Sequence, residues 1–245
     1  MRAAVVGALC VLTAPLASQA PGTPGIEDNS FLIEEAYNQD AGVVQHITTW
    51  QRSVVTAAWN FSFTQEWPLL SQRHQGSYTL LLGSSRTGAE FGGVALNYRY
   101  QLLPADDRIA IAPRASVLIP SHRDHLGAQL ELPVSVRISA AFVAHANAGV
   151  AATTRATTLS NLGASVVWLA RPTVNVLCEL TWNDEDGARV VLLNPGVRWA
   201  YNLSSGLQIV PGLAYTVGLG PSAGAEAAFI YLSFEHPFGG AAPEP

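Results

Sequence analysis

The 245-residue sequence predicts an all-β fold, an antiparallel up-and-down barrel of about twelve strands that crosses a membrane. Three observations predict it. Only 13% of the residues are charged, about half of the share usual in a soluble domain, although 49% are apolar. From residue 43 onward, apolar and polar residues alternate in long runs, which is the period of a β-strand. Within each run the charges fall on one face, so the other face suits lipid.

Residues 1–20 have the pattern of a secretory signal peptide. Arg2 supplies the positive charge, Ala3–Leu16 forms the apolar stretch, and small residues end at Ala20, where we expect cleavage. Pro15 and the shortness of the apolar run argue against a membrane-anchoring helix. We therefore expect the chain to be exported, and we find no later segment with the unbroken apolar length of a spanning helix.

Residues 21–42 form an acidic leader, which we place in the periplasm as a short segment before the barrel. Its acidic residues are Glu27, Asp28, Glu34, Glu35 and Asp40, and Ile26–Asp40 has no basic residue. Phe31, Leu32 and Tyr37 would share one face of a short helix that begins at Asn29 or Ser30. Two interpretations remain open: a solvated segment, or a small plug or lid under the barrel.

Residues 43–238 carry the alternation that defines the barrel, and residues 239–245 form a tail. In the stretch 127–138, for example, Leu130 and Leu132 alternate with Gln129 and Glu131. Turn residues separate such runs, and the expected strands are 43–52, 54–67, 76–83, 91–102, 107–119, 126–138, 140–152, 159–170, 172–183, 188–200, 206–217 and 226–236. Each proline inside a strand removes one ladder hydrogen bond, so we expect irregular pairing there. These prolines are Pro113, Pro133, Pro195 and Pro211.

The length of these strands favours a bilayer over a soluble sandwich. Most of them run to ten residues or more, close to the ~9–11 that cross a membrane at a tilt. A soluble sandwich has shorter strands and charges on its outer face. Aromatic residues gather near strand ends, as expected at the two membrane interfaces. Unpaired strand edges are too costly in hydrocarbon, so the sheet must close.

The polar face of the strands would line the lumen. The candidate lumen residues are Glu66, Arg99, Arg114, Glu131, Arg137, His145, Asn147, Glu179 and Arg198. Isolated charges in a narrow barrel are costly, so we expect pairs between adjacent strands, such as Arg114 with Glu131 and Glu179 with Arg198. The charges then form either a structural network that fills the lumen or the selective lining of a solute path.

Other chemistry is weakly indicated. The His122–His125 turn (HRDH) and the acidic turn Asn183–Gly187 lack the spacing of metal sites, so we expect no metal and no cofactor. Ser135, His145 and Asn147 share the lumen face but do not define a hydrolase. A sequence pI of about 5.6 without a basic cluster argues against nucleic acid.

Several stretches resemble a family of bacterial outer-membrane proteins, labelled transporters and similar to the "meta-pathway of phenol degradation" barrels. The resemblance covers the first half of the chain. It rests on Ile26–Gln39 (IEDNSFLIEEAYNQ), Gly42–Ile47 (GVVQHI), Phe63–Pro68 (FTQEWP), Ser71–Gln75 (SQRHQ), Leu96–Gln101 (LNYRYQ) and Ala112–Arg114 (APR). It implies a Gram-negative outer-membrane barrel that passes small, hydrophobic or aromatic molecules. One departure is that the chain continues past Phe238, whereas many such barrels end on an aromatic residue.

We therefore expect a passive, non-enzymatic channel for small solutes in the cell outer membrane. Its partners would be membrane lipid, a small-molecule solute and the barrel-assembly machinery. The alternatives are a structural or surface-interaction barrel with a filled lumen and, less favoured, an outer-membrane lipid hydrolase.

Overall fold

The computed structural model describes residues 25–27, 29–85, 88–103, 108–121, 126–154 and 158–237. The expected signal peptide at 1–20, the His122–His125 turn and the tail at 239–245 lie outside this part. Within the described ranges, no helix is both long enough and apolar enough to cross a membrane.

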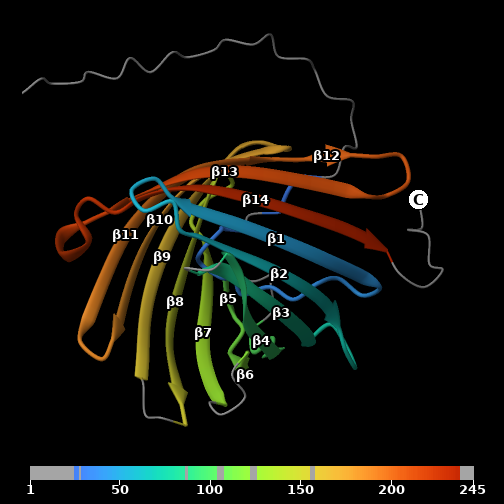
Figure 1. Cartoon of the computed structure of the whole chain (residues 1–245). Coiled ribbons are helices and arrows are strands. Elements are labelled where there is room, and N and C mark those ends of the chain that lie inside the picture. Colours follow the sequence, from blue (N-terminus) through green and yellow to red (C-terminus); the bar gives the residue numbers. More distant parts are fainter. Residues whose placement is uncertain are drawn as a thin grey trace, which may run out of the picture.

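From Val43 to Pro237 the chain forms one antiparallel sheet that closes on itself (Figure 1). Neighbours in sequence pair with each other, β1 pairs with β14, and β11 pairs with β13. The strands are β1 (Val43–Ser53), β2 (Trp59–Pro68), β3 (His74–Ser85), β4 (Gly88–Tyr100), β5 (Ile109–Ile111), β6 (Arg114–Pro120), β7 (Gly127–Arg137), β8 (Phe142–Thr153), β9 (Thr158–Arg171), β10 (Val174–Glu185), β11 (Ala188–Trp199), β12 (Tyr201–Asn202), β13 (Gln208–Gly218) and β14 (Glu226–Pro237). A 3-10 turn, η1 (Gly220–Ser222), precedes β14.

These segments make a closed barrel of twelve strands, which confirms the predicted fold class. β5 and β6 both pair with β7 and are two parts of one barrel strand, while β12 is a short continuation of β11.

The predicted second strand was too long. It begins at Trp59 and not at residue 54, because the chain turns between β1 and β2 and Ala57 has a φ of 60°.

Irregular pairing occurs at all four strand prolines, as predicted. Pro113 lies between β5 and β6 and has no N–H to donate to the ladder. Pro133 faces this break and falls in the gap between the registers of β7 with β5 and with β6. Pairing between β11 and β13 is interrupted next to Pro195, and Pro211 falls in the gap between the registers of β13 with β11 and with β12. Pro133 and Pro211 keep unbroken pairing only with β8 and β14.

A two-residue connection, Asp186 and Gly187, joins β10 to β11. Both have positive φ, 50° and 89°. This is the type I′ geometry that suits a two-residue hairpin, and Asp-Gly is among its preferred sequences.

Apolar and polar side chains are distributed as predicted, with the polar ones inside. Large apolar side chains on the outer face are exposed: Leu96, Val117, Leu130, Leu132, Leu162, Val166, Leu180, Leu213 and Ile230. Polar side chains on the inner face are buried: Gln45, Gln75, Arg99, Glu131, His145, Ser165, Asn175, Glu179, Asn194, Arg198 and Thr216. Leaving a large apolar side chain in water forgoes roughly 1.5–3 kcal/mol, so the outer face is suited to lipid.

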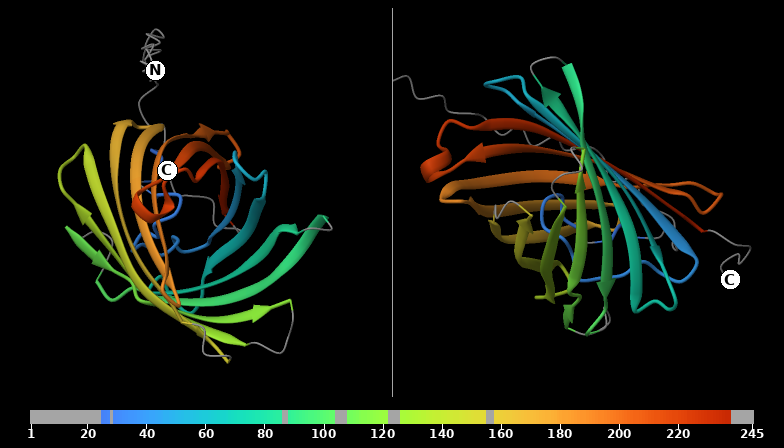
Figure 2. Two further views of the ribbon diagram at one scale, coloured as in Figure 1. Left: turned by 60° about the vertical axis from the view of Figure 1, so that its left-hand side comes forward. Right: turned by 60° about the horizontal axis from the view of Figure 1, so that its bottom comes forward.

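The leader lies inside this barrel (Figure 2). Two backbone hydrogen bonds hold its ends, from Ile26 N–H to the Pro172 carbonyl (2.7 Å) and from Val43 N–H to the Asp40 carbonyl (3.0 Å). Both lie at the end of the barrel where β1 begins, which we call the leader end; the opposite end, where β1 stops, is the loop end. Residues 29–42 contain no helix, so the predicted short helix is wrong. The leader is a plug and not a solvated segment.

Candidate functional site

The candidate site is the lumen, where the leader meets the inner face of the barrel. The leader rises from the leader end, turns at Leu32–Glu34 and returns to β1. A re-entrant loop has few hydrogen bonds of its own, so the barrel wall has to supply partners for its buried N–H and C=O groups. Polar side chains on the inner face do this.

Glu179 on β10 binds the first part of the leader. One carboxylate oxygen, Oε1, accepts the N–H groups of Phe31 (2.9 Å), Leu32 (2.6 Å) and Ile33 (3.0 Å). The other oxygen accepts from Asn194 Nδ2 at 2.7 Å. Glu179 is fully buried. Successive N–H groups that converge on one anion form a nest, and these charge-assisted bonds are stronger than neutral ones.

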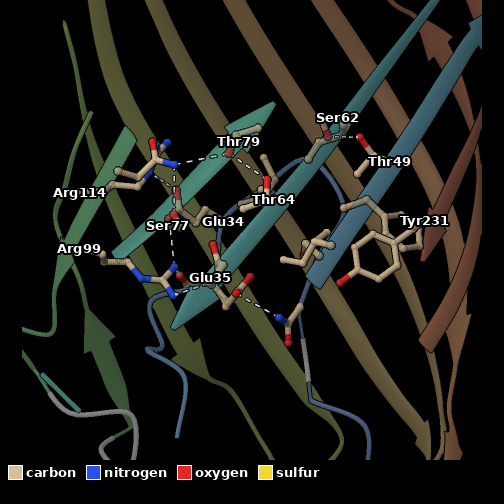
Figure 3. Close-up of a pocket in the computed structure, with 18 of the residues that line it drawn as sticks. Glu34, Glu35, Thr49, Ser62, Thr64, Ser77, Thr79, Arg99, Arg114 and Tyr231 are labelled. Carbon is tan, nitrogen blue, oxygen red and sulfur yellow. Dashed lines mark hydrogen bonds and ion pairs between the residues drawn. The ribbon is translucent and has the colours of Figure 1, made fainter. Parts of the chain in front are cut away.

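Two arginines bind the returning part. Glu34 bridges them, because Oε1 lies 3.0 Å from Arg99 Nη1 and Oε2 lies 2.8 Å from Arg114 Nε (Figure 3). Arg99 also donates to Asn38 Oδ1 (3.0 Å), to the Glu35 carbonyl (3.2 Å) and to the Tyr37 carbonyl. This guanidinium, 2% exposed, thus binds two carbonyls and two side chains within Glu34–Asn38 of the leader.

Further wall side chains complete the binding of the leader backbone. The Asn147 amide, with its nitrogen toward Glu34, donates to the Glu34 carbonyl (2.8 Å) and accepts from the Glu34 N–H (2.9 Å). Gln101 accepts the Asn38 N–H (3.0 Å) and donates to the Ala36 carbonyl (2.6 Å). Three more wall side chains each bind one leader group: Ser135 accepts the Ala36 N–H (2.8 Å), Gln75 accepts the Gln39 N–H (2.7 Å), and Arg198 donates to the Asn29 carbonyl (2.5 Å).

Glycines in the wall make room for the apolar leader side chains. A Cβ added at Gly212 would lie 2.6 Å from the Phe31 ring, and one at Gly163 would lie 2.2 Å from Ile33 Cδ1. The Phe31 ring also contacts the rings of Phe229 and Tyr231, with centroids 5.4 and 5.2 Å away. The leader is therefore matched to the lumen in shape as well as in polarity.

Glu35 is the buried acid of the leader. Its side chain accepts a hydrogen bond from Asn29 Nδ2 at 3.0 Å. Burial raises the pKa of Glu35 from 4.5 to about 7, and the attraction of Arg99 only partly opposes this rise. A group with this pKa changes its charge near neutral pH.

Eight of the nine predicted lumen residues are buried or half-buried on the inner face. They are Glu66, Arg99, Arg114, Glu131, His145, Asn147, Glu179 and Arg198. Arg137 belongs to the same face, but it is exposed at the last position of β7.

The charged partners differ from those expected. Among the described residues, Arg114 forms its ion pair with Glu34 and not with Glu131. Glu131 accepts hydrogen bonds from Asn161 Nδ2 (2.7 Å) and Gln129 Nε2 (3.2 Å). Glu179 and Arg198 both bind the leader backbone. Neither expected pair forms, because the leader binds Arg114, Glu179 and Arg198, and two amides of the wall bind Glu131.

Sequence reasoning left out several residues that hold the leader, namely Glu34, Gln75 and Gln101. The alternation places both glutamines on the inner face, so the same pattern could have predicted them as lumen residues. Glu34 has no such signal, because the leader lacks a regular period.

The Ser135–His145 pair is occupied by the leader. Ser135 Oγ lies 2.7 Å from His145 Nδ1, and each residue is 1% exposed. The Ser135 hydroxyl also accepts the Ala36 N–H. The leader therefore covers the atoms that a hydrolase would need to present to a substrate. Over the described part of the chain, no three His, Cys, Asp or Glu side chains are grouped as for a metal ion.

Two lumen cavities, of about 340 and 280 Å³, adjoin the leader tip. Both are lined by Leu32, Ile33, Glu34 and Arg114. The larger extends over β1–β4 and the smaller over β7–β10. Each is of a size to hold water or a small solute.

The sequence matches no family model and no curated protein. Solved outer-membrane barrels share its fold. The chain is similar to a KdgM porin, at 7% identity and a TM-score of 0.53, over 80% of this chain and 99% of that one. It is similar to the NanC porin, at 7% identity and a TM-score of 0.55, over 79% and 99%. It is also similar to the COG4313 outer membrane channel from Pseudomonas putida F1, at 13% identity and a TM-score of 0.54, over 83% and 98%.

Proposed function

We propose that this protein is an outer-membrane channel for small solutes whose lumen is closed by its own leader. The observation that carries the proposal is the way the leader is bound. Side chains from several strands, among them Glu179, Ser135 and Arg99, hold a separate loop in the lumen. Passage would require the leader tip to move aside.

The topology of the leader supports such a movement. Both of its ends are held at the same end of the barrel, by Pro172 and by the start of β1. The loop can therefore withdraw from the lumen without being threaded through it. Its bonds to the wall are polar, and water can replace polar partners as the loop leaves.

The outer surface supports a place in the outer membrane. The closed barrel has no free strand edge, and its exposed face is apolar over the length of the strands. We infer export by a cleaved signal peptide, assembly by the barrel-assembly machinery and contact with membrane lipid. Heat-modifiable migration on gels and recovery in the outer-membrane fraction test this location.

The resemblance to the "meta-pathway of phenol degradation" barrels adds a substrate class to the proposal, namely small hydrophobic or aromatic molecules. Direct uptake assays with labelled phenol would test it.

A structural barrel with a permanently filled lumen is the second candidate. The fit of Phe31 and Ile33 against wall glycines favours it, because such a match stabilises the closed state. The two candidates predict different behaviour once the leader is removed.

Conductance across a planar lipid bilayer separates them. The full chain is compared with a variant that lacks residues 29–38, and both are first checked for heat-modifiable migration. A channel predicts rare, small openings for the full chain and a stable, larger conductance for the deletion variant. A deletion variant that folds but conducts no more than the full chain would refute the channel and leave the structural barrel.

A further inference from the structure

The larger lumen cavity has a wall of hydroxyl and amide groups. β1–β4 contribute Thr49, Ser62, Thr64, Ser77, Thr79 and Asn97 to it. All six side chains are half-buried, so they face the cavity without being closed off. Figure 3 shows these hydroxyls in a row between Arg114 on one side and Tyr231 on the other.

The hydroxyls are paired in a way that leaves hydrogen-bonding capacity. Thr49 Oγ1 lies 2.6 Å from Ser62 Oγ, and Thr64 Oγ1 lies 2.9 Å from Thr79 Oγ1. Each pair uses one of its two O–H donors, and every hydroxyl oxygen has two lone pairs. The second O–H of each pair and several lone pairs remain for a ligand in the cavity.

The opposite side of the cavity is apolar and aromatic. Phe31, Phe229 and Tyr231 form a contiguous group, with Ile47 and Leu32 beside it. A ligand that fits both sides therefore has several hydroxyl groups and one apolar face.

The charges around the cavity disfavour anions. Its lining contains three carboxyl groups, of Glu34, Glu35 and Glu66, and two guanidinium groups, of Arg99 and Arg114. Glu34 binds both guanidinium groups, at 3.0 and 2.8 Å. An anionic ligand would meet like charges without a positive partner, and this mismatch costs binding free energy.

The cavity is reached from the loop end while the leader stays bound. A second cavity of about 340 Å³ adjoins it and shares Leu32, Thr49, Ser62 and Phe229 with it. That cavity is lined further on by residues near the loop-end termini of their strands: Gln51, Asn60 and Gly83. A ligand therefore has a way in that does not pass the leader.

We propose that the larger cavity binds a neutral polyhydroxy compound of about monosaccharide size, with its hydroxyls on Thr49, Ser62, Thr64 and Thr79 and its apolar face on Phe229 and Tyr231. Its volume, about 340 Å³, is at the small end of ligand sites. The inference rests on the proposed function in that the bound compound would be a solute of the channel, and the polar wall of this cavity favours a polyol over the hydrophobic or aromatic molecules that the resemblance implies.

Binding is tested on the full chain in detergent micelles, by saturation-transfer NMR titration with three probes. Glucose is the neutral polyol, glucuronate is the same ring with a carboxylate, and phenol is an aromatic with a single hydroxyl. We expect glucose to bind at least tenfold more tightly than glucuronate and more tightly than phenol. Glucuronate or phenol binding as tightly as glucose, or no binding of glucose, would overturn the proposal.

Variants locate the site. Thr64→Val combined with Thr79→Val removes one pair of hydroxyls with little change in shape, and Thr49→Val combined with Ser62→Ala removes the other pair. We expect each to weaken glucose binding about tenfold, whereas Thr48→Val, on the outer face of β1, leaves it unchanged. Equal affinity in all variants would place the glucose elsewhere and refute the assignment. Because binding requires no passage, glucose binding to a barrel that never conducts would refute only the channel.

Discussion

The carboxylate of Glu179 is predicted to hold the leader in the lumen, and replacing it by leucine tests this directly. Glu179→Leu has a similar volume but no acceptor, so it leaves the N–H groups of Phe31, Leu32 and Ile33 without their partner. Each unsatisfied buried N–H costs about 1–3 kcal/mol. Three of them weaken leader binding by at least about 3 kcal/mol, which changes the ratio of bound to released leader by more than about 100-fold.

Glu179→Gln is a milder substitution at the same position, with a smaller expected loss of leader binding. Glutamine keeps one acceptor oxygen but no charge, and a hydrogen bond to a neutral group is roughly half as strong as one to a charged group. We therefore expect leader binding to weaken by about 1–3 kcal/mol, less than with leucine. Glu185→Gln is the matched control, because Glu185 lies on the same strand but is exposed at its end.

Hydrogen exchange measured by mass spectrometry on a peptide that covers residues 29–39 reports these free energies. The exchange of leader amides should become faster in the order Glu185→Gln, Glu179→Gln, Glu179→Leu, while peptides from the barrel strands keep their protection. Leader exchange in Glu179→Leu that stays within about threefold of the unmodified protein would refute the reasoning, since about 3 kcal/mol requires a far larger change.

Two further predictions follow from the packing and charge of the leader. Gly163→Val places side-chain atoms where Ile33 lies, since even a Cβ there would be 2.2 Å from Ile33 Cδ1. Overpacking of this kind costs about 1–3 kcal/mol, so leader exchange should accelerate, whereas Ala164→Val on the outer face should not change it. The second prediction concerns pH. Glu35 has its ordinary pKa of 4.5 when the leader is released and about 7 when it is bound, near Arg99, Glu34, Glu66 and Asn29. The bound state holds the extra proton between these values, so leader binding is strongest below pH 4.5, weakens by about 3 kcal/mol as the pH rises to 7, and is constant above it. Glu35→Gln should remove this part of the pH dependence in the same exchange measurement, and a dependence of unchanged size in Glu35→Gln would assign it to other groups.

The barrel was predictable because its pattern is local. In Gly127–Arg137, neighbouring side chains point to opposite faces, so the order of Leu130, Glu131 and Leu132 is enough to place the carboxylate inside and the leucines outside. The same rule placed Arg99, Glu179 and Arg198 correctly. The alternation could not predict which residues these side chains bind, because closure of the barrel brings together segments that are far apart in sequence.

The leader was the element that its own residues could not decide. Its five acids and its scattered Phe31, Leu32 and Tyr37 suit a solvated segment or a short helix equally well. Its conformation depends on side chains from several strands, such as Glu179, Arg99 and Ser135, which meet its backbone only after the barrel has closed. A period of two along the chain, together with low charge, is sufficient for strands, faces and a lipid-suited surface. The filling of the lumen is a tertiary property, because the side chains that bind the leader backbone at residues 29–39 lie 36 to 169 positions away in sequence and are brought to it only by closure of the sheet.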